Sequence, residues 1–298
     1  MVLDSTALSI TKGGSALVDV PFPGAIGTEL DGINDRGQIV GLLTTSGGQE
    51  HGFLDDRGLF SPIVAPFPGT EPTLTFGINN EGQIVGGYVN ISGSHGFVDH
   101  KGRFSSIDVP FAGALETSAF GINDRNQNDR ADDRGNRGQI VGQYHDNVGP
   151  HGFVDNKGRF SPIDVPFPGA SATFARDIND RGQIVGIYDD STGRHGFVDD
   201  RGRFSPIDVP FPGVSETNAL GINNRGRIVG SYFDSSGGHG FLADPVKRFA
   251  GTPGKANCPG QSVSAVARQF GGLYAAAAAL EFSNAQALED AILAFCQE

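Results

Sequence analysis

A loop near the middle of the chain carries oxygen side chains at a spacing that suits a calcium ion. It reads DRNQNDRADD, and its first, third, fifth and ninth positions are Asp124, Asn126, Asn128 and Asp132. Calcium takes six or more oxygen ligands, and alternate side chains of a loop that wraps around the ion point inward. The spacing therefore predicts a calcium site. Two Arg residues among the acids leave a solvated polar loop as the alternative.

A second group of residues could support catalysis. Some copies of an internal repeat depart from the Phe-Gly or Leu-Gly that the other copies carry, and the residues at these departures are Glu29, Asp31, Arg176 and Asp177. Two further acidic residues stand at the start of the same segment in other copies, Glu116 and Glu216. Paired carboxylates can act as acid and base in glycoside hydrolysis. An acidic chain offers such pairs by composition alone, however. Because no Ser-His-Asp order, Gly-rich phosphate loop or zinc spacing occurs, we expect a non-catalytic protein, with a hydrolase or lyase as the alternative.

A third group combines aromatic rings with polar oxygens. The sequence Pro-Phe recurs in the connectors, and a loop with an Asp or Asn recurs between two predicted strands. Sugars stack their C–H face on an aromatic ring and hydrogen-bond through their hydroxyls, so several such sites would bind glycans with avidity. The alternative is that each ring fills the gap between neighbouring sheets. The residues are Phe22, Phe67, Phe111, Phe167, Phe211, Asn90, Asp146, Asp190 and Asp234.

Five His residues recur at one position of the repeat. Each begins a His-Gly-Phe tripeptide, and an Ile-Asn pair recurs in step with it. A ring of His could bind a metal or donate protons, but an element copied in every repeat is usually framework. We expect each His, and each Asn before its tight turn, to hydrogen-bond within its own repeat. The His residues are His51, His95, His151, His195 and His239.

These residues are positioned by a repeat of 44 residues that occurs five times, once with a 12-residue insertion. The fullest copy, from Thr173 to Gly213, holds four short segments rich in β-branched and aromatic residues: TFARDIN, QIVGIY, HGFVD and RFSPIDVP. Turn signals with Gly separate them, which is typical of antiparallel strands. Four strands in each of five repeats predict an all-β fold, a five-bladed β-propeller over residues 15–250. A β-solenoid is the alternative.

The lengths of the turns predict the order of strands. The longest connector follows Phe-Pro-Gly and should join blades, which makes TFARDIN the innermost strand and RFSPIDVP the outermost. The last repeat has no IDVP segment, whereas Leu17–Pro21 supplies one near the N-terminus. We expect this first strand to complete the last blade and close the ring.

The repeats resemble a known family. The pattern G-I-N-x-x-G-Q-I-V-G followed by H-G-F, as in 221–230 and 239–241, is similar to the HAF-type extracellular repeats of bacteria over roughly residues 15–245. This resemblance implies a secreted or surface propeller and no particular activity. The insertion resembles the DxDxDGxxD loops of integrin-type calcium-binding propellers, although Asp129 stands where those loops have Gly.

From about residue 251 the composition changes to helix-forming sequence. The only two cysteines, Cys258 and Cys296, bracket this tail, and a disulfide that staples a small helical segment over 251–298 is the prediction. It implies an oxidising, extracellular or periplasmic location. Two reduced cysteines are the alternative. The tail also resembles C-terminal segments of secreted proteins from soil α-proteobacteria.

Composition excludes some partners. With 22 basic and 34 acidic residues the net charge is −12, which argues against nucleic acid and anionic membranes. The 45 glycines keep no period of three, so the chain is not collagen-like. We expect a secreted, calcium-stabilised propeller that binds ligands multivalently, with glycans favoured and a non-catalytic scaffold or adhesion protein as a further alternative. The sequence leaves the ligand and the oligomeric state open.

Overall fold

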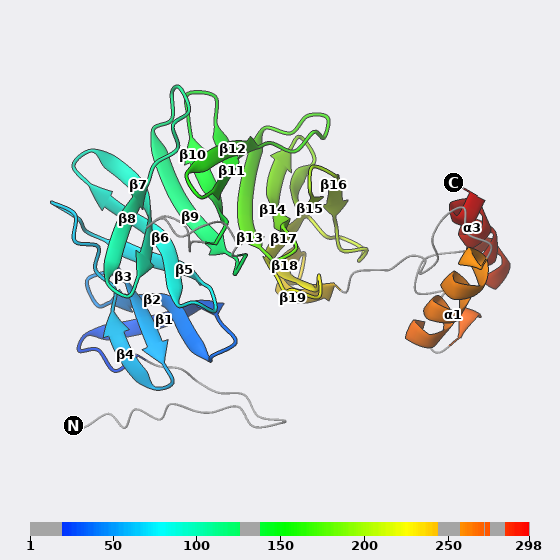
Figure 1. The fold of residues 1–298 in the computed structure, drawn as a ribbon, viewed down its shortest axis with the longest axis horizontal. Helices are drawn as coiled ribbons and strands as arrows, with labels where there is room; N and C mark the ends of the chain where they lie inside the picture. Colours follow the sequence, from blue (N-terminus) through cyan, green and yellow to red (C-terminus); the bar gives the residue numbers. More distant parts are fainter. Residues whose placement is uncertain (1–19, 126–137, 244–256, 271, 275–283, 298) are drawn as a thin grey trace. The chain divides into compact units, whose positions relative to one another are not determined.

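In the computed structural model the first three repeats each fold into a four-stranded antiparallel sheet, and repeats 4 and 5 are joined into one sheet by a single parallel pairing of Arg194 with Glu216 (Figure 1). The structure describes residues 20–125, 138–243, 257–270, 272–274 and 284–297. Repeat 1 forms β1 (Ala25–Ile33), β2 (Gln38–Thr45), β3 (Glu50–Asp56) and β4 (Leu59–Pro62), and repeat 2 forms β5 (Thr73–Ile78), β6 (Gln83–Asn90), β7 (Gly93–His100) and β8 (Arg103–Ile107). Repeat 3 forms β9 (Glu116–Ile122), β10 (Ile140–His145), β11 (Pro150–Asn156) and β12 (Arg159–Ile163). Repeat 4 forms β13 (Ala172–Ile178), β14 (Gln183–Asp190), β15 (Gly193–Asp200) and β16 (Phe204–Ile207), and repeat 5 forms β17 (Glu216–Ile222), β18 (Ile228–Asp234) and β19 (Gly237–Ala243).

The first strands of the repeats lie next to one another around a central channel. Strands β1, β5, β9, β13 and β17 contact their neighbours in this order, and residues from all five line the same cavity. Within each sheet the strands follow chain order outward. Sheets stacked radially in this way form a β-propeller, so the predicted all-β propeller and its strand order are confirmed.

In the first four repeats, the tight turn between the last two strands has positive φ angles, as in the mirror image of an ordinary type I turn. Arg57 and Gly58 both have positive φ, at 57° and 93°, and they alone separate β3 from β4. A two-residue loop with two positive φ values is the type I′ hairpin, whose twist matches that of the strands. Glycine satisfies the second position without steric cost. Lys101, Lys157 and Arg201 take the same place as Arg57 in repeats 2, 3 and 4.

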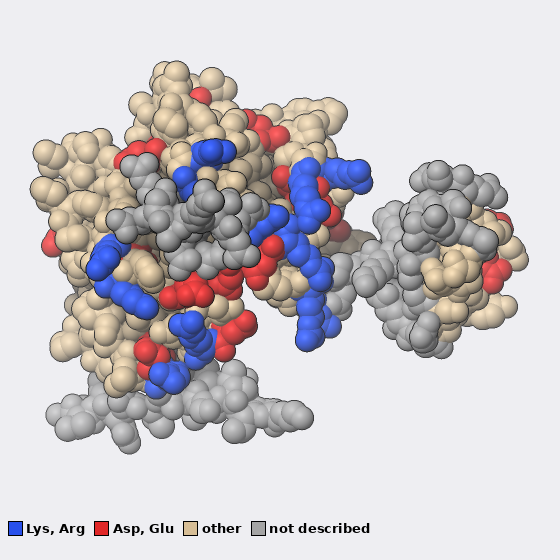
Figure 2. Space-filling view, in the orientation of Figure 1, with Lys and Arg blue, Asp and Glu red and all other residues tan. Residues whose placement is uncertain are grey.

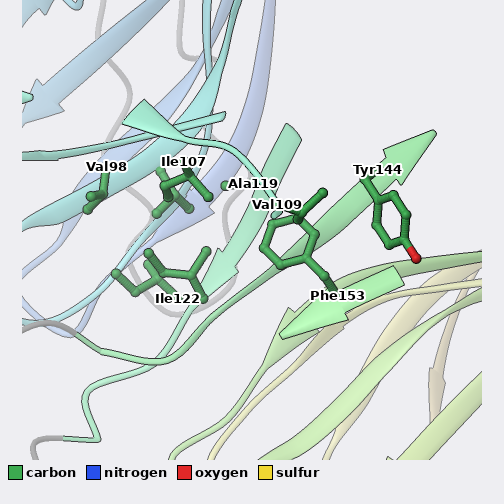
Figure 3. Packing of buried hydrophobic residues seen from close by; sticks show 9 residues of the cluster. Val98, Ile107, Val109, Ala119, Ile122, Tyr144 and Phe153 are labelled. Carbon is green, nitrogen blue, oxygen red and sulfur yellow. The ribbon is translucent and has the colours of Figure 1, made fainter. Parts of the chain in front are cut away.

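Neighbouring sheets share hydrophobic cores. In the core between repeats 2 and 3, Val85, Val98 and Ile107 of one sheet meet Ile122 and Phe153 of the next (Figure 3). The Phe of each His-Gly-Phe tripeptide in the first four repeats is fully buried, and these residues are Phe53, Phe97, Phe153 and Phe197. Each repeat therefore stabilises the one beside it, as repeat proteins require.

A series of amide hydrogen bonds also joins the repeats. The Asn34 Nδ2 donates to the backbone oxygen of Asn79 at 3.0 Å, and Asn79 donates in the same way to Asn123 at 3.1 Å. Asn123 and Asn179 continue the series into repeats 4 and 5, at 3.0 and 3.1 Å. The Oδ1 atom of each Asn also accepts two backbone N–H groups of its own turn. One side chain thus closes a turn and connects two sheets.

The outward face of repeat 5 differs from the others. Val229 and Leu242 are 51% and 59% exposed, whereas Val40, Val85, Val141 and Val185, the equivalents of Val229, are fully buried. On the facing side of repeat 1, Ile33 is 67% exposed. The predicted closing strand, Leu17–Pro21, lies outside the described residues except for Val20 and Pro21. Val20 is buried against Leu43 and Phe53 of repeat 1.

The chain divides into two compact units, Met1–Ala243 and Asp244–Glu298. In the second unit, helices α1 (Cys258–Phe270) and α3 (Ala285–Gln297) contact each other. The predicted disulfide is confirmed: Cys258 and Cys296 are bonded, with their Cα atoms 5.7 Å apart. The described helices include none that is long and apolar enough to span a membrane.

Candidate functional site

A β-bulge in each first strand directs one side chain into the central channel. In β1 the pairing with β2 shifts between Leu30 and Gly32, which leaves Asp31 outside the regular ladder. Such a bulge adds one residue to a strand and re-aims its side chain. The same shift occurs in β5, β9, β13 and β17. The bulged residues all line the channel, and they are Asp31, Phe76, Phe120, Arg176 and Leu220.

The channel is large enough for an organic ligand. The cavity has a volume of about 970 Å³, which is within the size range of ligand pockets in proteins. Besides the bulged residues, Glu29, Glu50 and Asp177 contribute polar atoms to its lining. Five equivalent positions therefore carry a carboxylate, two aromatic rings, a guanidinium and an aliphatic side chain, so the lining is chemically asymmetric.

Acidic side chains gather on the repeat 1 side of the channel. Removal from water, together with the negative charges of Glu29 and Glu50, raises the pKa of Asp31 to about 7. Asp31 therefore holds its proton at neutral pH far more readily than an ordinary carboxyl group. A protonated carboxyl beside ionised ones can donate a proton or a hydrogen bond.

Arg176 lies on the opposite part of the ring of bulged residues. Its Cζ lies 4.5 Å from the centre of the Phe120 ring and 5.6 Å from that of Phe174. Desolvation and the positive charge of nearby Arg194 lower the pKa of Arg176. Arg194 itself donates to both oxygens of Asp189, at 2.8 and 3.1 Å. This part of the channel therefore places the Arg176 guanidinium beside aromatic rings, next to the Asp177 carboxyl group.

Asp177 links repeats 4 and 5. Its Oδ2 accepts the backbone N–H of Ile222 and its Oδ1 that of Ile178, both at 2.8 Å. Burial raises the pKa of Asp177 and the two hydrogen bonds lower it, and because burial has the larger effect the pKa is about 6. The carboxylate thus holds two strands together at the channel wall.

The structure separates the proposed catalytic residues into two groups. Asp31, Arg176 and Asp177 all line the channel, whereas Glu116 and Glu216 do not. Glu116 pairs in register with His145 and Glu216 with Phe233, at the starts of β9 and β17. Phe76 and Phe120 were missed as channel residues. They occupy the position of Arg176 in their own repeats, so aligning the repeats on that residue would have found them.

The recurring Phe residues stack within the propeller. Phe67 lies 4.6 Å from Tyr88 and Tyr88 lies 5.1 Å from His95, measured between ring centres. The same stack occurs in repeats 3, 4 and 5. Phe67, Phe111 and Phe167 are partly buried against the cores between sheets, and Phe211 is 53% exposed. This placement fits the packing alternative better than open stacking platforms.

The polar residues near these stacks hold turns. Asn90 Oδ1 accepts the backbone N–H of Ser92 at 2.7 Å, and Asp190 Oδ1 accepts that of Thr192 at 2.6 Å. Asp146 and Asp234 cap the equivalent turns of repeats 3 and 5. Hydrogen bonds to these turns lower the pKa values of all three Asp residues.

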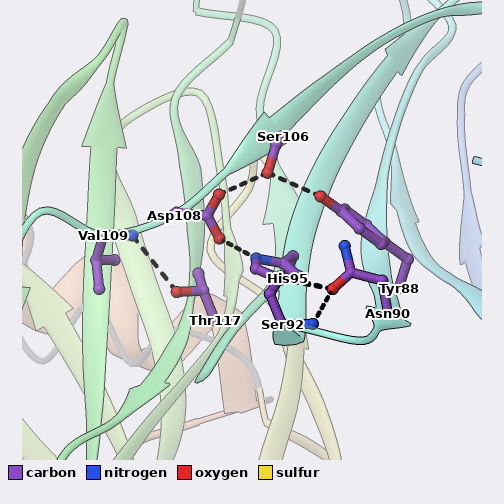
Figure 4. A network of polar contacts seen from close by, with 8 residues as sticks. All are labelled: Tyr88, Asn90, Ser92, His95, Ser106, Asp108, Val109 and Thr117. Atoms are coloured by element: carbon purple, nitrogen blue, oxygen red, sulfur yellow. Dashed lines mark hydrogen bonds and ion pairs between the residues drawn. The ribbon is translucent and has the colours of Figure 1, made fainter. Parts of the chain in front are cut away.

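A hydroxyl, an imidazole and a carboxyl group form a row in repeat 2 (Figure 4), in which His95 hydrogen-bonds within its own repeat as expected. Ser92 Oγ lies 2.9 Å from His95 Nε2, and His95 Nδ1 lies 2.6 Å from Asp108 Oδ1. Ser92 Oγ also donates to Asn90 Oδ1 at 2.6 Å, and the same oxygen accepts the backbone N–H of Ser92 at 2.7 Å. The row therefore stabilises a turn, as Thr192, His195 and Asp208 do in repeat 4.

Most of the expected calcium loop lies outside the described residues, including Asn126, Asn128 and Asp132. Asp124 is described, and its two oxygens accept the backbone and side-chain N–H of Asn80, both at 2.6 Å. Asp124 therefore belongs to the polar contacts between repeats 2 and 3. No cluster of three potential metal ligands occurs among the described residues.

The fold and the channel define a β-propeller with a polar, partly aromatic cavity on its axis. No model of a known protein family matches the chain, and no curated protein does. It is similar in fold to a fucose-recognising six-bladed lectin of the fungus Aleuria aurantia, with 13% identity over 74% of this chain and 76% of the lectin, at a TM-score of 0.43. A mutant of AofleA from Arthrobotrys oligospora has 12% identity over 78% and 73%, at 0.46. A GH43 endo-arabinanase from Bacillus licheniformis has 11% identity over 76% and 96%, at 0.38.

Proposed function

We propose that this protein is a five-bladed β-propeller that binds carbohydrate in its central channel. The observation that carries the proposal is the lining of the cavity of about 970 Å³, which combines Phe76 and Phe120 with carboxylates and the guanidinium groups of Arg176 and Arg227. A sugar needs an aromatic surface for its C–H face and charged or polar groups for its hydroxyls. The channel supplies both within one cavity.

The channel replaces the recurring connector Phe residues and the Asp and Asn residues of the turns as the favoured binding site. The connector Phe rings stack on Tyr rings, and the Asp and Asn oxygens accept hydrogen bonds from their own turns. Both kinds of group are therefore engaged within the protein. The multivalent sites expected from the sequence become the alternative, which predicts several ligands for each chain in place of one.

Binding stoichiometry and two matched variants test the proposal. A glycan array identifies ligands, and isothermal titration calorimetry then measures their affinity and number. We expect one ligand per chain and a loss of roughly tenfold or more for Phe76→Ala, since stacking on an aromatic ring contributes about 0.5–1.5 kcal/mol beyond the area it buries. The matched control, Phe111→Ala, removes the same kind of side chain from a connector outside the channel. A loss in Phe111→Ala alone, or no glycan bound at all, would contradict the channel proposal.

Hydrolysis is the second candidate, and Asp31 is the observation that favours it. A carboxyl group with a pKa of about 7 beside Glu29 and Glu50 has the character of a general acid next to a carboxylate. Chromatography of reducing ends released from a bound glycan tests this candidate. Products that appear with the native protein and disappear with Asp31→Asn would support it, and an unchanged glycan would exclude it for that ligand.

The remaining sequence-based expectations are kept as proposals. The disulfide supports an extracellular or periplasmic location, which fits the resemblance to secreted bacterial repeats. Calcium remains proposed for the insertion after Asp124. Because each carboxylate oxygen has two lone pairs, accepting from Asn80 does not exhaust the capacity of Asp124 to bind an ion.

A further inference from the structure

Arg176 breaks the symmetry of the channel in a way that the fold does not require. The equivalent positions carry Asp31, Phe76, Phe120 and Leu220, and the bulge forms with each of these side chains. A guanidinium is therefore not needed to build the strand. Its presence calls for another explanation.

The charge of Arg176 has no partner among the described residues. Its Nε is buried and makes no hydrogen bond, and no described carboxylate forms an ion pair with it. The adjacent Asp177 carboxylate accepts the N–H groups of Ile178 and Ile222 and does not contact the guanidinium. A partly buried positive charge without a partner destabilises a protein. An anionic ligand would remove this cost when it binds.

The surroundings of Arg176 favour a planar anion. The guanidinium lies over the Phe120 ring, and stacking of this kind leaves N–H groups at its edge directed away from the ring. Those N–H groups form a fork that matches the two oxygens of a carboxylate.

The other side of the channel favours hydroxyl groups. Glu29, Asp31 and Glu50 line the repeat 1 side, where carboxylates can accept hydrogen bonds from sugar hydroxyls. Phe76, whose ring centre lies 4.9 Å from that of Phe120, provides an apolar surface between the two sides. Figure 2 shows that acidic and basic side chains lie next to each other on one face of the propeller, with several acidic ones near its middle.

We propose that the channel binds a hexuronic acid residue, with its carboxylate on Arg176, its C–H face on Phe76 and its hydroxyls toward the carboxylates of repeat 1. This inference rests on the proposed function and names the ligand class for the same site. A neutral sugar would leave Arg176 unpaired. An amino sugar would place its charge on the acidic side and also leave Arg176 unpaired.

Titration calorimetry with matched ligands tests the inference. The ligands are short oligosaccharides of galacturonic, glucuronic and mannuronic acid, the methyl ester of each, and chitosan oligosaccharides as the cationic probe. For at least one acid, the native protein should bind the free acid at least tenfold more tightly than its ester. Arg176→Leu, which copies Leu220, should weaken acid binding roughly 10- to 100-fold, the range for a charge-assisted hydrogen bond, and change ester binding less than about threefold. Arg203→Leu removes an exposed Arg that does not line the channel and should change neither.

The outcomes separate the two proposals. Equal binding of acid and ester, or stronger binding of chitosan, would overturn the uronic acid inference and leave the carbohydrate proposal standing. If neither acid, ester nor any glycan of the array binds, both are wrong. A second measurement does not depend on the variant folding: in the native protein, the Nε–H resonance of Arg176 should shift on addition of the acid and not of the ester. An unshifted resonance at saturation would also overturn the inference.

Discussion

The amide series between repeats predicts a difference in stability between two equivalent Asn residues. Asn179 is 3% exposed, and its Nδ2 donates to the backbone oxygen of Asn223 and to Gln183 Oε1, at 3.1 and 2.9 Å. Its Oδ1 accepts two backbone N–H groups at 3.0 Å. Asn223 accepts two such groups in the same way, at 2.9 and 3.0 Å, but it is exposed and is the last of the series in the described chain.

Replacing each residue by Ala isolates the contribution of the Nδ2 donors. Asn223→Ala removes only the bonds within the turn, whereas Asn179→Ala also removes two partly buried hydrogen bonds, one to Gln183 of its own repeat and one to Asn223 of the next repeat. At about 1 kcal/mol for each bond, Asn179→Ala should lower the free energy of unfolding by about 2 kcal/mol more than Asn223→Ala does.

Urea denaturation followed by tyrosine fluorescence measures this difference. The chain has no Trp, and Tyr88, Tyr144, Tyr188 and Tyr232 all lie in the propeller, so the signal reports mainly on that unit. An equal loss in the two variants, within about 0.5 kcal/mol, would refute the reasoning, because the connection between sheets would then contribute nothing measurable.

Four further predictions concern individual side chains. The pKa of Asp177 is about 6 in the folded protein against an ordinary value of 3.8, so the folded state binds its proton more tightly and the free energy of unfolding falls as pH rises from 4 to 7, by at most about 3 kcal/mol. The stability difference between the native protein and Asp177→Asn should therefore change over that range, and a constant difference would contradict the assignment. Burial alone would lower the pKa of His195, but Asp208 and Asp190 outweigh it and raise the pKa, so Asp208→Asn should lower the midpoint of its NMR titration, and an unmoved midpoint would count against the pair. Removing the disulfide with Cys258→Ser should destabilise the helical unit by about 2–4 kcal/mol and leave the propeller transition in calorimetry unchanged; a shifted propeller transition would show coupling between the units. Excess chelator should lower the melting temperature of the propeller if calcium binds the insertion, and an unchanged temperature would exclude a structural ion.

The fold could be predicted from the sequence because five copies of the repeat carry the same pattern of strands and turns. Turn signals such as Asp-Arg-Gly, the alternation of β-branched residues and the constant spacing all indicate the same antiparallel sheet, and agreement between such local signals is strong evidence. The disulfide followed from there being only two cysteines, Cys258 and Cys296. The exposed face of repeat 5 was not predictable, because Val229 and Val185 occupy the same sequence position and differ only in what lies beside them.

The candidate site was predicted in part. Asp31, Arg176 and Asp177 were found as departures from the repeat, and they line the channel. Phe76 and Phe120 follow the pattern of the repeat at this position, so a search for departures from the repeat does not find them. Sequence spacing cannot show a bulge, and the bulge decides which residue of the strand faces the channel. The rings at Phe67 and Phe111 were considered for sugar stacking, and only their distances to Tyr88 and Tyr144 reveal that they are engaged.

The bulges have a consequence for how the specificity of such a protein can change. A bulged residue stands outside the regular strand pairing, so its side chain can be exchanged with little effect on the sheet. The five repeats already demonstrate this, since Asp, Phe, Arg and Leu all occur at that position on nearly the same backbone. Under the proposed function, ligand recognition and folding would therefore be encoded in separate residues of the same strand. A lineage could acquire a new ligand by substitutions at five sites while the scaffold stays under its own, independent selection.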